Sequence, residues 1–213
     1  MTTQVTVVDY GMGNLYSVQR ALESVGAEVT VSGDAAVVAG ASRLILPGVG
    51  AFADGMAGLR ERGLVEPIRR HAQSGRPLMG ICLGMQMLAG VSEEFGEHAG
   101  LDLIAGRVVA VPAVTTEGSA QKIPNIGWRN LAPAENADWS RTALATTRAG
   151  ESVYLVHSFH FVPTDARHVL AHCEYGGHRV TAAVGGGRMI GCQFHPEKSG
   201  AVGLQILSRF VQD

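Results

Sequence analysis

A cysteine framed by two glycines is the residue best placed to do chemistry in this chain. Cys82 follows a short apolar run that suits a buried strand, and Gly80 and Gly84 stand two residues away on either side. We expect these glycines to let the backbone turn sharply from strand into helix, which exposes the thiol at the sheet edge. Free N–H groups and the dipole of that helix would favour the thiolate, whereas the alternative is a buried structural cysteine. The apolar stripe that predicts the helix consists of Leu83, Met87 and Leu88.

A base for this thiol stands much later in the chain. His195 comes directly after an apolar run, and Glu197 follows two residues on. A thiol nucleophile needs a base to take its proton and a third group to hold that base in one tautomer. The alternative is a histidine in a surface loop beside an exposed carboxylate. If their strand end lies beside Cys82, His195 and Glu197 complete a Cys-His-Glu triad.

The first half of the chain alternates between strand and helix patterns, and this alternation must position Cys82. A helical pattern follows the first strand, residues 34–40 are short and helical or irregular, and residues 56–73 are helical with breaks at Gly63 and Pro67. Such alternation predicts a parallel sheet covered on both faces, whose ligands collect at the carboxyl ends of the strands. Apolar runs predict strands over residues 5–9, 27–31, 43–46 and 78–81.

The second half reads as short strands separated by Gly, Pro and Asn. Residues 115–122 are polar and predict a loop, and residues 204–211 predict an amphipathic helix. We therefore expect antiparallel strands and hairpins added to a mostly parallel α/β core, within one domain over residues 1–213. The predicted strands cover residues 108–111, 126–131, 152–156, 169–173, 180–184 and 189–194.

Two glycine-rich turns follow predicted strands and leave alternatives open. Residues 9–15 contain a G-x-G, but Tyr16 stands where a dinucleotide fingerprint has its third glycine, so a tight turn with Asn14 as the helix cap competes with that interpretation. Residues 48–53 match G-x-G-x-x-A, although Pro47 stands at the strand end. The competing interpretation is a flexible turn whose backbone N–H groups face an oxyanion.

Bulk properties exclude several classes of protein. Of 213 residues 46% are hydrophobic and 17% charged, which argues against disorder, and a net charge of −2 without a basic stripe argues against nucleic-acid binding. No apolar run reaches the roughly 18 residues of a membrane helix, and no basic segment precedes the first apolar run. Three sparse cysteines favour a reducing, cytoplasmic setting. A zinc site among His157, His160, His168, His172 and Cys173 is disfavoured because they fall in strand-like segments without zinc-ligand spacing.

The motifs resemble a known family. Residues 80–86 (G-I-C-L-G-M-Q) with residues 194–199 (F-H-P-E-K-S) resemble the Cys-His-Glu triad of class I glutamine amidotransferases. Residues 9–15 (D-Y-G-M-G-N-L), 47–50 (P-G-V-G) and 156–159 (V-H-S-F) resemble the glutaminase subunits of imidazole glycerol phosphate synthases, and the similarity spans nearly the whole chain. The resemblance implies a flavodoxin-like three-layer fold.

The resemblance also implies a reaction and its residues. The Cys82 thiolate would attack the side-chain amide carbon of glutamine, His195 would pass a proton to the leaving ammonia, and Glu197 would orient His195. Water would then cleave the thioester, and no metal or organic cofactor would take part. The implied oxyanion donors are the backbone N–H groups of Val49, Gly50 and Leu83. The implied glutamine-binding positions are Gly50, Gln86, Ser158 and Phe159.

The implied partner is a (β/α)8-barrel cyclase subunit that receives the ammonia within a heterodimer. There ammonia would help form imidazole glycerol phosphate and aminoimidazole carboxamide ribotide, and glutaminase activity would stay low until the barrel and its ligand bind. We expect the docking face around Asn14, the Pro47 turn, Asn125 and Trp128. The family commonly has P-H-M-G-W-N where this chain has P-N-I-G-W-R at residues 124–129, so Asn125 and Arg129 depart from it.

Three other functions compete with this one. A related glutaminase could feed ammonia to another synthase, such as the vitamin B6 type, which the D-Y-G-M-G-N-L opening disfavours, or to a different barrel cyclase. A non-catalytic binding subunit would have no need to keep all of Cys82, His195 and Glu197. An NAD-binding protein would retain its nucleotide on purification.

Overall fold

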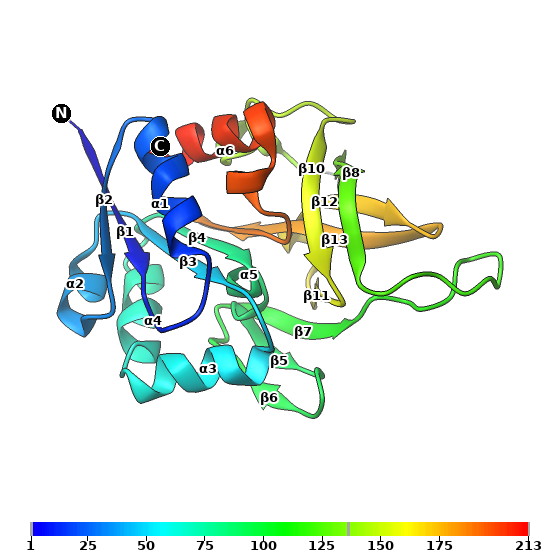
Figure 1. Ribbon diagram of the computed structural model, residues 1–213, viewed down its shortest axis with the longest axis horizontal. Helices are drawn as coiled ribbons and strands as arrows, with labels where there is room; N and C mark the ends of the chain where they lie inside the picture. The colour runs from blue at the N-terminus through cyan, green and yellow to red at the C-terminus, as the bar shows by residue number, and fades with distance from the viewer. Residues whose placement is uncertain (1, 136, 213) are drawn as a thin grey trace.

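The computed structural model describes residues 2–135 and 137–212, and in them a sheet of eight strands carries Cys82 (Figure 1). Strands β2, β1, β3, β4 and β14 pair in parallel, and β14, β13, β12 and β9 continue the sheet in antiparallel fashion. The predicted mixed sheet is therefore confirmed. In sheet order the strands are β2 (Ala27–Ser32), β1 (Thr3–Val8), β3 (Leu44–Gly48), β4 (Leu78–Cys82), β14 (Met189–Cys192), β13 (His178–Gly186), β12 (Val169–Tyr175) and β9 (Ala132–Pro133).

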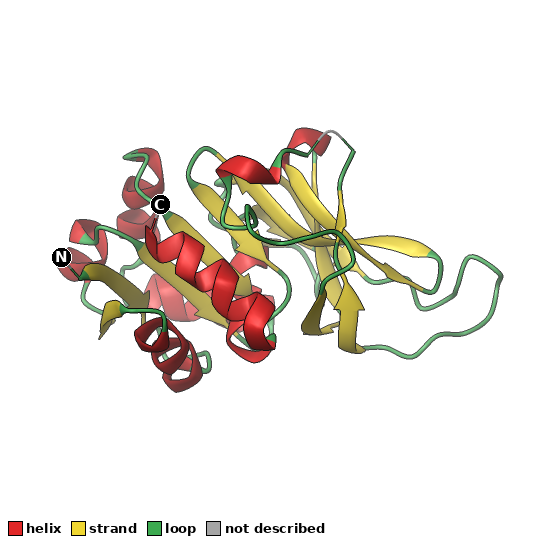
Figure 2. Ribbon diagram, turned by 90° about the horizontal axis from the view of Figure 1, so that it is seen from above, coloured by secondary structure: helices red, strands yellow, loops and turns green. Residues whose placement is uncertain are grey.

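Helices cover both faces of this sheet, which gives three layers (Figures 1 and 2). Helices α1 (Leu15–Ser24) and α6 (Gly200–Gln212) lie above the sheet in Figure 1 and share one apolar core with it. The helices of the second core are α2 (Ala35–Gly40), α3 (Phe52–Glu61) and α4 (Val65–Gln73). Both faces of the parallel strands are thus buried, as their nearly continuous apolar sequence requires.

Alternation along the strands decides which core each side chain joins. In β3, Ile45 joins the core of α1 and α6, whereas Leu44 and Leu46 join the core of α3 and α4. Successive strand residues point to opposite faces, so a fully apolar strand feeds both cores at once. Because β1, β3, β4 and β14 run in parallel, their carboxyl ends meet at one edge. That edge brings together the turns after residues 8, 48, 82 and 192.

Two expected boundaries were wrong. Pro67 does not break a helix, because it lies in the first turn of α4, where its missing N–H would have no helical partner. The predicted helix after Cys82 is only one turn, α5 (Leu83–Gln86), and the chain re-enters a strand, β5 (Ala89–Ser92). Met87 and Leu88, which the periodicity assigned to the helix, are buried between α5 and β5. Apolar spacing alone cannot distinguish a single helical turn followed by a strand from a longer helix.

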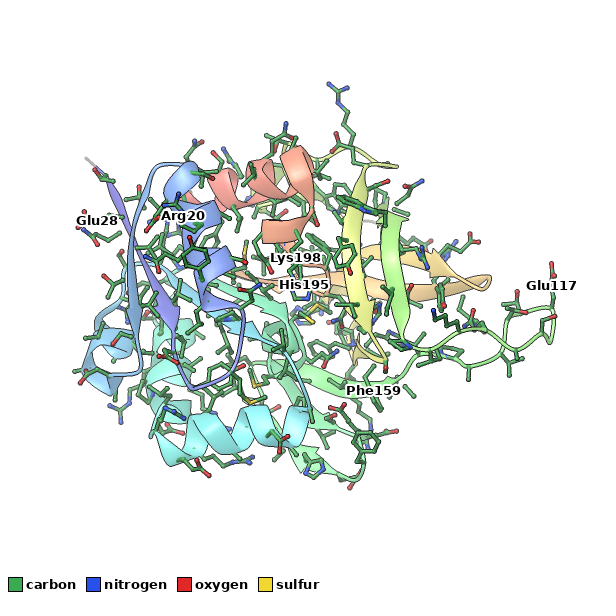
Figure 3. The ribbon with its side chains drawn as sticks, viewed as in Figure 1. Arg20, Glu28, Glu117, Phe159, His195 and Lys198 are labelled. Carbon is green, nitrogen blue, oxygen red and sulfur yellow. The ribbon has the colours of Figure 1, made fainter. Side chains whose placement is uncertain are left out.

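Two smaller sheets complete the fold. One has the order β11-β7-β5-β6 and the other pairs β10 with β8 in antiparallel fashion. Strands β5, β6 and β11 were not predicted. Residues 115–122 form the predicted loop, and Figure 3 shows Glu117 at its tip, far from His195. The strands not yet given are β6 (His98–Ala99), β7 (Ile104–Ala110), β8 (Asn125–Asn130), β10 (Ser152–His157) and β11 (Phe159–Pro163).

The helix cap at Asn14, the state of the cysteines and the search for membrane helices can be compared directly with the sequence expectations. Asn14 caps α1, since its side-chain oxygen accepts the N–H of Ser17 at 3.3 Å. All three cysteines are buried free thiols. Short 3-10 turns cover Trp139–Arg141, Ala166–His168 and Pro196–Lys198. Within the described ranges, no helix is both long and apolar enough to cross a membrane.

Candidate active site

The sharp turn at Cys82 depends on close packing of its neighbouring glycines. A Cβ on Gly84 would lie 1.8 Å from the carbonyl oxygen of Leu46, and one on Gly80 would lie 2.7 Å from the carbonyl oxygen of Gly84. Neither glycine has a positive φ; Cys82 itself does, at φ 55° and ψ −110°. The glycines therefore allow the expected tight turn by leaving room for the neighbouring backbone, and not through dihedral angles of their own. They let β4 and α5 approach β3, while the cysteine carries the strained backbone.

The helix after Cys82 is too short to supply the expected dipole. With four residues, α5 aligns few peptide units, so we attribute no thiolate stabilisation to it. Leu83 is its first residue, and the N–H of a first helical residue has no partner inside the helix. Gly48 pairs with Cys82 across β3 and β4, which brings the turn after β3 beside the nucleophile. Backbone donors from two segments therefore lie close to the thiol.

The segment after β14 holds His195 rigidly. The backbone N–H of His195 donates to the carbonyl of Tyr154 at 2.9 Å, and the hydroxyl of Ser199 donates to the carbonyl of His195 at 2.7 Å. Nδ1 of His195 lies 2.8 Å from Oε1 of Glu197, and these side chains are only 3% and 1% exposed. The carboxylate accepts the Nδ1–H, which leaves Nε2 for proton transfer.

Cys82 and Glu197 perturb the titration of His195. Burial lowers the pKa of the imidazole, but its interactions with the sulfur of Cys82 and the carboxylate of Glu197 outweigh burial and raise it to about 9. Nε2 makes no hydrogen bond of good geometry within the described part of the chain, to the Cys82 sulfur included. A charged imidazolium at neutral pH is a proton donor already in place.

A pocket of about 300 Å³ opens over these groups. It brings Cys82 and His195 together with every position expected to hold the oxyanion or glutamine, while Glu197 stands behind His195 and does not line it. In Figure 3, His195 lies between the layered sheet and strand β10, and Phe159 lies near the lower ends of β8 and β10. The lining residues are Val49, Gly50, Cys82, Leu83, Gln86, Glu94, Pro124, Val156, His157, Ser158, Phe159 and His195.

Tyr10 anchors the turn after β3. Its buried hydroxyl donates to the carbonyl of Pro47 at 2.9 Å, and a Cβ on Gly48 would lie 2.5 Å from that hydroxyl. Burial, followed by the charge of Cys82, raises the pKa of Tyr10. Gly50 has φ 90°, which a residue with a side chain rarely adopts. The turn is thus tied to Tyr10 at Pro47, and its backbone at position 50 has a conformation that favours glycine.

The three residues expected at a docking face differ in exposure. Trp128 is 53% exposed, with its ring against Tyr154, and Asn14 is half-buried at the start of α1. Asn125 is fully buried, and its amide nitrogen lies 3.0 Å from Nε2 of His157. Its side chain therefore belongs to the interior of the molecule, because β8 alternates inward and outward residues at this point.

Sequence reasoning gave no role at this site to Glu94, Tyr10 or Gln193, and it discussed His157 only as a zinc ligand. Oε2 of Glu94 accepts the N–H of Phe52 at 2.6 Å at the start of α3, and Glu94 also lines the pocket. The sequence signalled a role for Glu94 only by placing a carboxylate in a polar loop. Burial lowers the pKa of His157 to about 4, so it is neutral. Among the described residues, no group of His, Cys, Asp or Glu could hold a metal ion.

Comparison with known proteins gives consistent matches. The glutamine amidotransferase class-I family matches residues 6–213. Imidazole glycerol phosphate synthase subunit HisH 1 of Legionella pneumophila strain Paris is 49% identical over 211 residues, 99% of each chain. The HisH subunit of Geobacillus thermodenitrificans is 50% identical, covering 98% of this chain and 95% of that one. The structure of PurLQS from Thermotoga maritima shares the fold, with a TM-score of 0.72 at 22% identity, over 100% of this chain and 97% of that one.

Proposed function

Since this chain belongs to the class-I glutamine amidotransferases and, within them, to the HisH subunits of imidazole glycerol phosphate synthase, we propose that its Cys82 pocket hydrolyses glutamine for histidine biosynthesis. One observation carries the proposal. A cysteine on a strained elbow opens into the same pocket as a histidine whose other nitrogen is bonded to a buried carboxylate. Residues 1–213 act as one glutaminase domain in this proposal.

The reaction proceeds in two stages. The sulfur of Cys82 attacks the side-chain amide carbon of glutamine, the carbon–nitrogen bond breaks, and the imidazolium of His195 gives its proton to the leaving ammonia. Water, deprotonated by His195, then attacks the thioester, and the carbon–sulfur bond breaks to release glutamate and the thiolate. Glu197 holds His195 in the tautomer that both steps need. A histidine charged at neutral pH suits the first step.

Backbone groups stabilise the tetrahedral intermediates. The N–H of Leu83 has no helical partner, and the turn at Val49 and Gly50 lines the pocket, so together they act as the oxyanion donors. Gly50 gives that turn the freedom to rotate a peptide toward the pocket. A resting turn that needs such a rotation keeps glutamine hydrolysis slow in the isolated subunit.

The amino-acid end of glutamine binds at the rim of the pocket. Gln86 and Glu94 supply an amide and a carboxylate, and Glu94 is the acidic residue among those lining the pocket. A carboxylate suits the positive amino group of the substrate. The backbone of Ser158 and Phe159, where β10 passes into β11, completes the wall.

The ammonia passes to a barrel-shaped cyclase subunit in a heterodimer. Free ammonia is protonated in water at neutral pH and loses its nucleophilicity, so the pocket must open into a partner. The half-exposed Trp128 and Ile126 on β8 and the exposed Tyr16 near Asn14 give the face around the pocket an apolar character that suits docking. In this proposal the partner closes the pocket and sets the turn at Gly50.

The test is glutamate release from glutamine by the native chain, alone and then with a barrel cyclase subunit of imidazole glycerol phosphate synthase and that subunit's nucleotide ligand. The proposal expects low release alone and a rise of about a hundredfold or more with both additions, as for a loss or gain of one oxyanion donor. High release by the isolated chain would contradict the resting turn. No release under any condition would contradict the glutaminase function.

A further inference from the structure

A buried glutamine stands beside the nucleophile and has no role in the chemistry described so far. Gln193 follows β14 directly and is 0% exposed. Its backbone N–H donates to the carbonyl of Ala182 at 2.9 Å, which fixes the residue to β13. Its side-chain nitrogen lies 3.8 Å from the sulfur of Cys82, within the range of an N–H to sulfur hydrogen bond. A fully buried amide at this place calls for an explanation, because burying it is costly unless both ends are bonded.

The hydrogen-bond network fixes which end of this amide faces the sulfur. A backbone carbonyl can only accept, so the side-chain atom of Gln86 that lies 2.9 Å from the Phe159 carbonyl oxygen must be its nitrogen. The same nitrogen lies 3.0 Å from the side chain of Gln193, which must therefore present its oxygen to Gln86. The nitrogen of Gln193, with its two N–H donors, is left facing Cys82.

The Phe159 carbonyl orients a second side chain in the same way. Nδ1 of His157 lies 2.9 Å from that oxygen and must carry the proton, so Nε2 is an acceptor for the amide nitrogen of Asn125 at 3.0 Å. A charged His157 would lose that acceptor, and burial keeps the ring neutral by lowering its pKa to about 4. The wall that orients Gln86 and Gln193 is therefore itself held in one hydrogen-bonding state.

We propose that Gln193 is a positioning residue that donates a side-chain N–H to the sulfur of Cys82 and stabilises it as the thiolate. The inference rests on the proposed role of Cys82 as the nucleophile. An N–H aimed at sulfur favours the anion before attack and again when the thioester breaks, since the sulfur carries negative charge at both points. With α5 too short to act through its dipole, this donor supplies what the sequence led us to expect from the helix.

The first experiment measures alkylation of Cys82 by iodoacetamide in the native chain, followed by mass spectrometry of the peptide that carries it. Cys173 and Cys192 are buried outside the pocket, and burial raises the pKa of both thiols, so they react slowly. Gln193→Met keeps the length of the side chain and removes its donor. We expect alkylation of Cys82 at about pH 7 to slow by about tenfold.

A second variant guards against a simple packing effect. Gln193→Glu keeps the size of the side chain, and it can donate to sulfur only while the carboxyl is protonated. Its alkylation deficit relative to the native chain should therefore grow from about pH 6 to about pH 9. Gln121→Met makes the same replacement as the first variant in a loop outside the pocket and should alkylate at the native rate.

Turnover in the complex with the cyclase separates this role from substrate binding. Gln193→Met should lower kcat for glutamine by about tenfold with a smaller change in KM, whereas Gln86→Met should mainly raise KM. Native alkylation rates in both Gln193 variants would overturn the proposal. A rise in KM with unchanged alkylation would also overturn it, assigning Gln193 to glutamine binding through Gln86. If the native complex released no glutamate, the glutaminase function would fall, while alkylation would still test the N–H to sulfur contact.

Discussion

Nδ1 of His195 and Oε1 of Glu197 lie 2.8 Å apart in a part of the protein that water hardly reaches, with 3% and 1% of the two side chains exposed. Only one residue, Pro196, separates them, and the 3-10 turn Pro196–Lys198 folds Glu197 back onto the ring. A short, buried bond of this kind fixes the tautomer of the histidine and favours its charged form. The chemistry at Cys82 therefore depends on a carboxylate that does not line the pocket.

Replacing that carboxylate by its amide should cripple the enzyme without unfolding it. In Glu197→Gln the side chain keeps its shape, but the amide can donate to Nδ1 and so select the wrong tautomer. We expect kcat for glutamine hydrolysis in the complex to fall by roughly a thousandfold, with little change in KM. Glu174→Gln, the same change on the exposed face of β12, should keep the native rate. An active Glu197→Gln enzyme would show that His195 needs no orienting carboxylate.

The raised pKa of His195 sets the alkaline limit of activity. The imidazolium that protonates ammonia persists until pH approaches about 9, so kcat/KM should be level below that value and fall as pH rises through it. Glu197→Gln removes one of the charges that raise this pKa, and its residual activity should therefore fall at a lower pH. A pH profile of glutamate release measures both. An alkaline limb centred near the ordinary value of about 6.5 in the native complex would contradict this ion pair.

Neutral buried histidines should make the fold sensitive to mild acid. Burial lowers the pKa of both His157 and His160 to about 4, so between about pH 6.5 and 5 the unfolded chain takes up protons that the native state refuses. The free energy of unfolding then falls as pH falls, by up to about 1.4 kcal/mol per pH unit for each group. Urea unfolding across that range gives the slope. His160→Gln should reduce it, and a flat dependence in the native protein would contradict the buried neutral state.

The close approach at the elbow predicts a large effect of one methyl group. Gly84→Ala places a Cβ 1.8 Å from the carbonyl oxygen of Leu46, which a backbone atom cannot avoid without moving β3 or α5. We expect a loss of about 3 kcal/mol in the free energy of unfolding. Gly40→Ala, at the end of α2 with nothing within 4 Å, should change it by less than about 1 kcal/mol. Thermal and urea unfolding of the two variants measures both changes, and equal stabilities of the two variants would contradict the close approach at Gly84.

Much of the fold could be predicted because its signals are local. The alternation of apolar strands and helices predicted the parallel core, and the turns after residues 8, 48 and 82 follow from it. Where two local interpretations compete, pattern alone failed. Leu83, Met87 and Leu88 have helical spacing, yet only one turn of helix forms before the chain enters β5. Proline breaks a helix in its interior but is tolerated in its first turn. The sequence did not show that α4 begins at Val65, so Pro67 was predicted to be a break.

The site residues could be predicted only where they belong to a recognisable sequence motif. Cys82 and His195 stand in conspicuous motifs, and the structure brings them to one pocket. Gln193 and Tyr10 act through contacts with residues far along the chain, and no local pattern reveals such contacts. Asn125 was expected on a docking face, but the side-chain alternation of β8 turns it inward toward His157.

The most direct test of the central claim is glutamate release by Cys82→Ala in the complex with the cyclase and its nucleotide ligand. Cys173→Ala, which removes a thiol buried in β12 outside the pocket, serves as the matched control. We expect no release above background from Cys82→Ala, a fall of more than about a thousandfold, and near-native release from Cys173→Ala. Glutamine hydrolysis that survives in Cys82→Ala would contradict the assignment of Cys82 as the nucleophile.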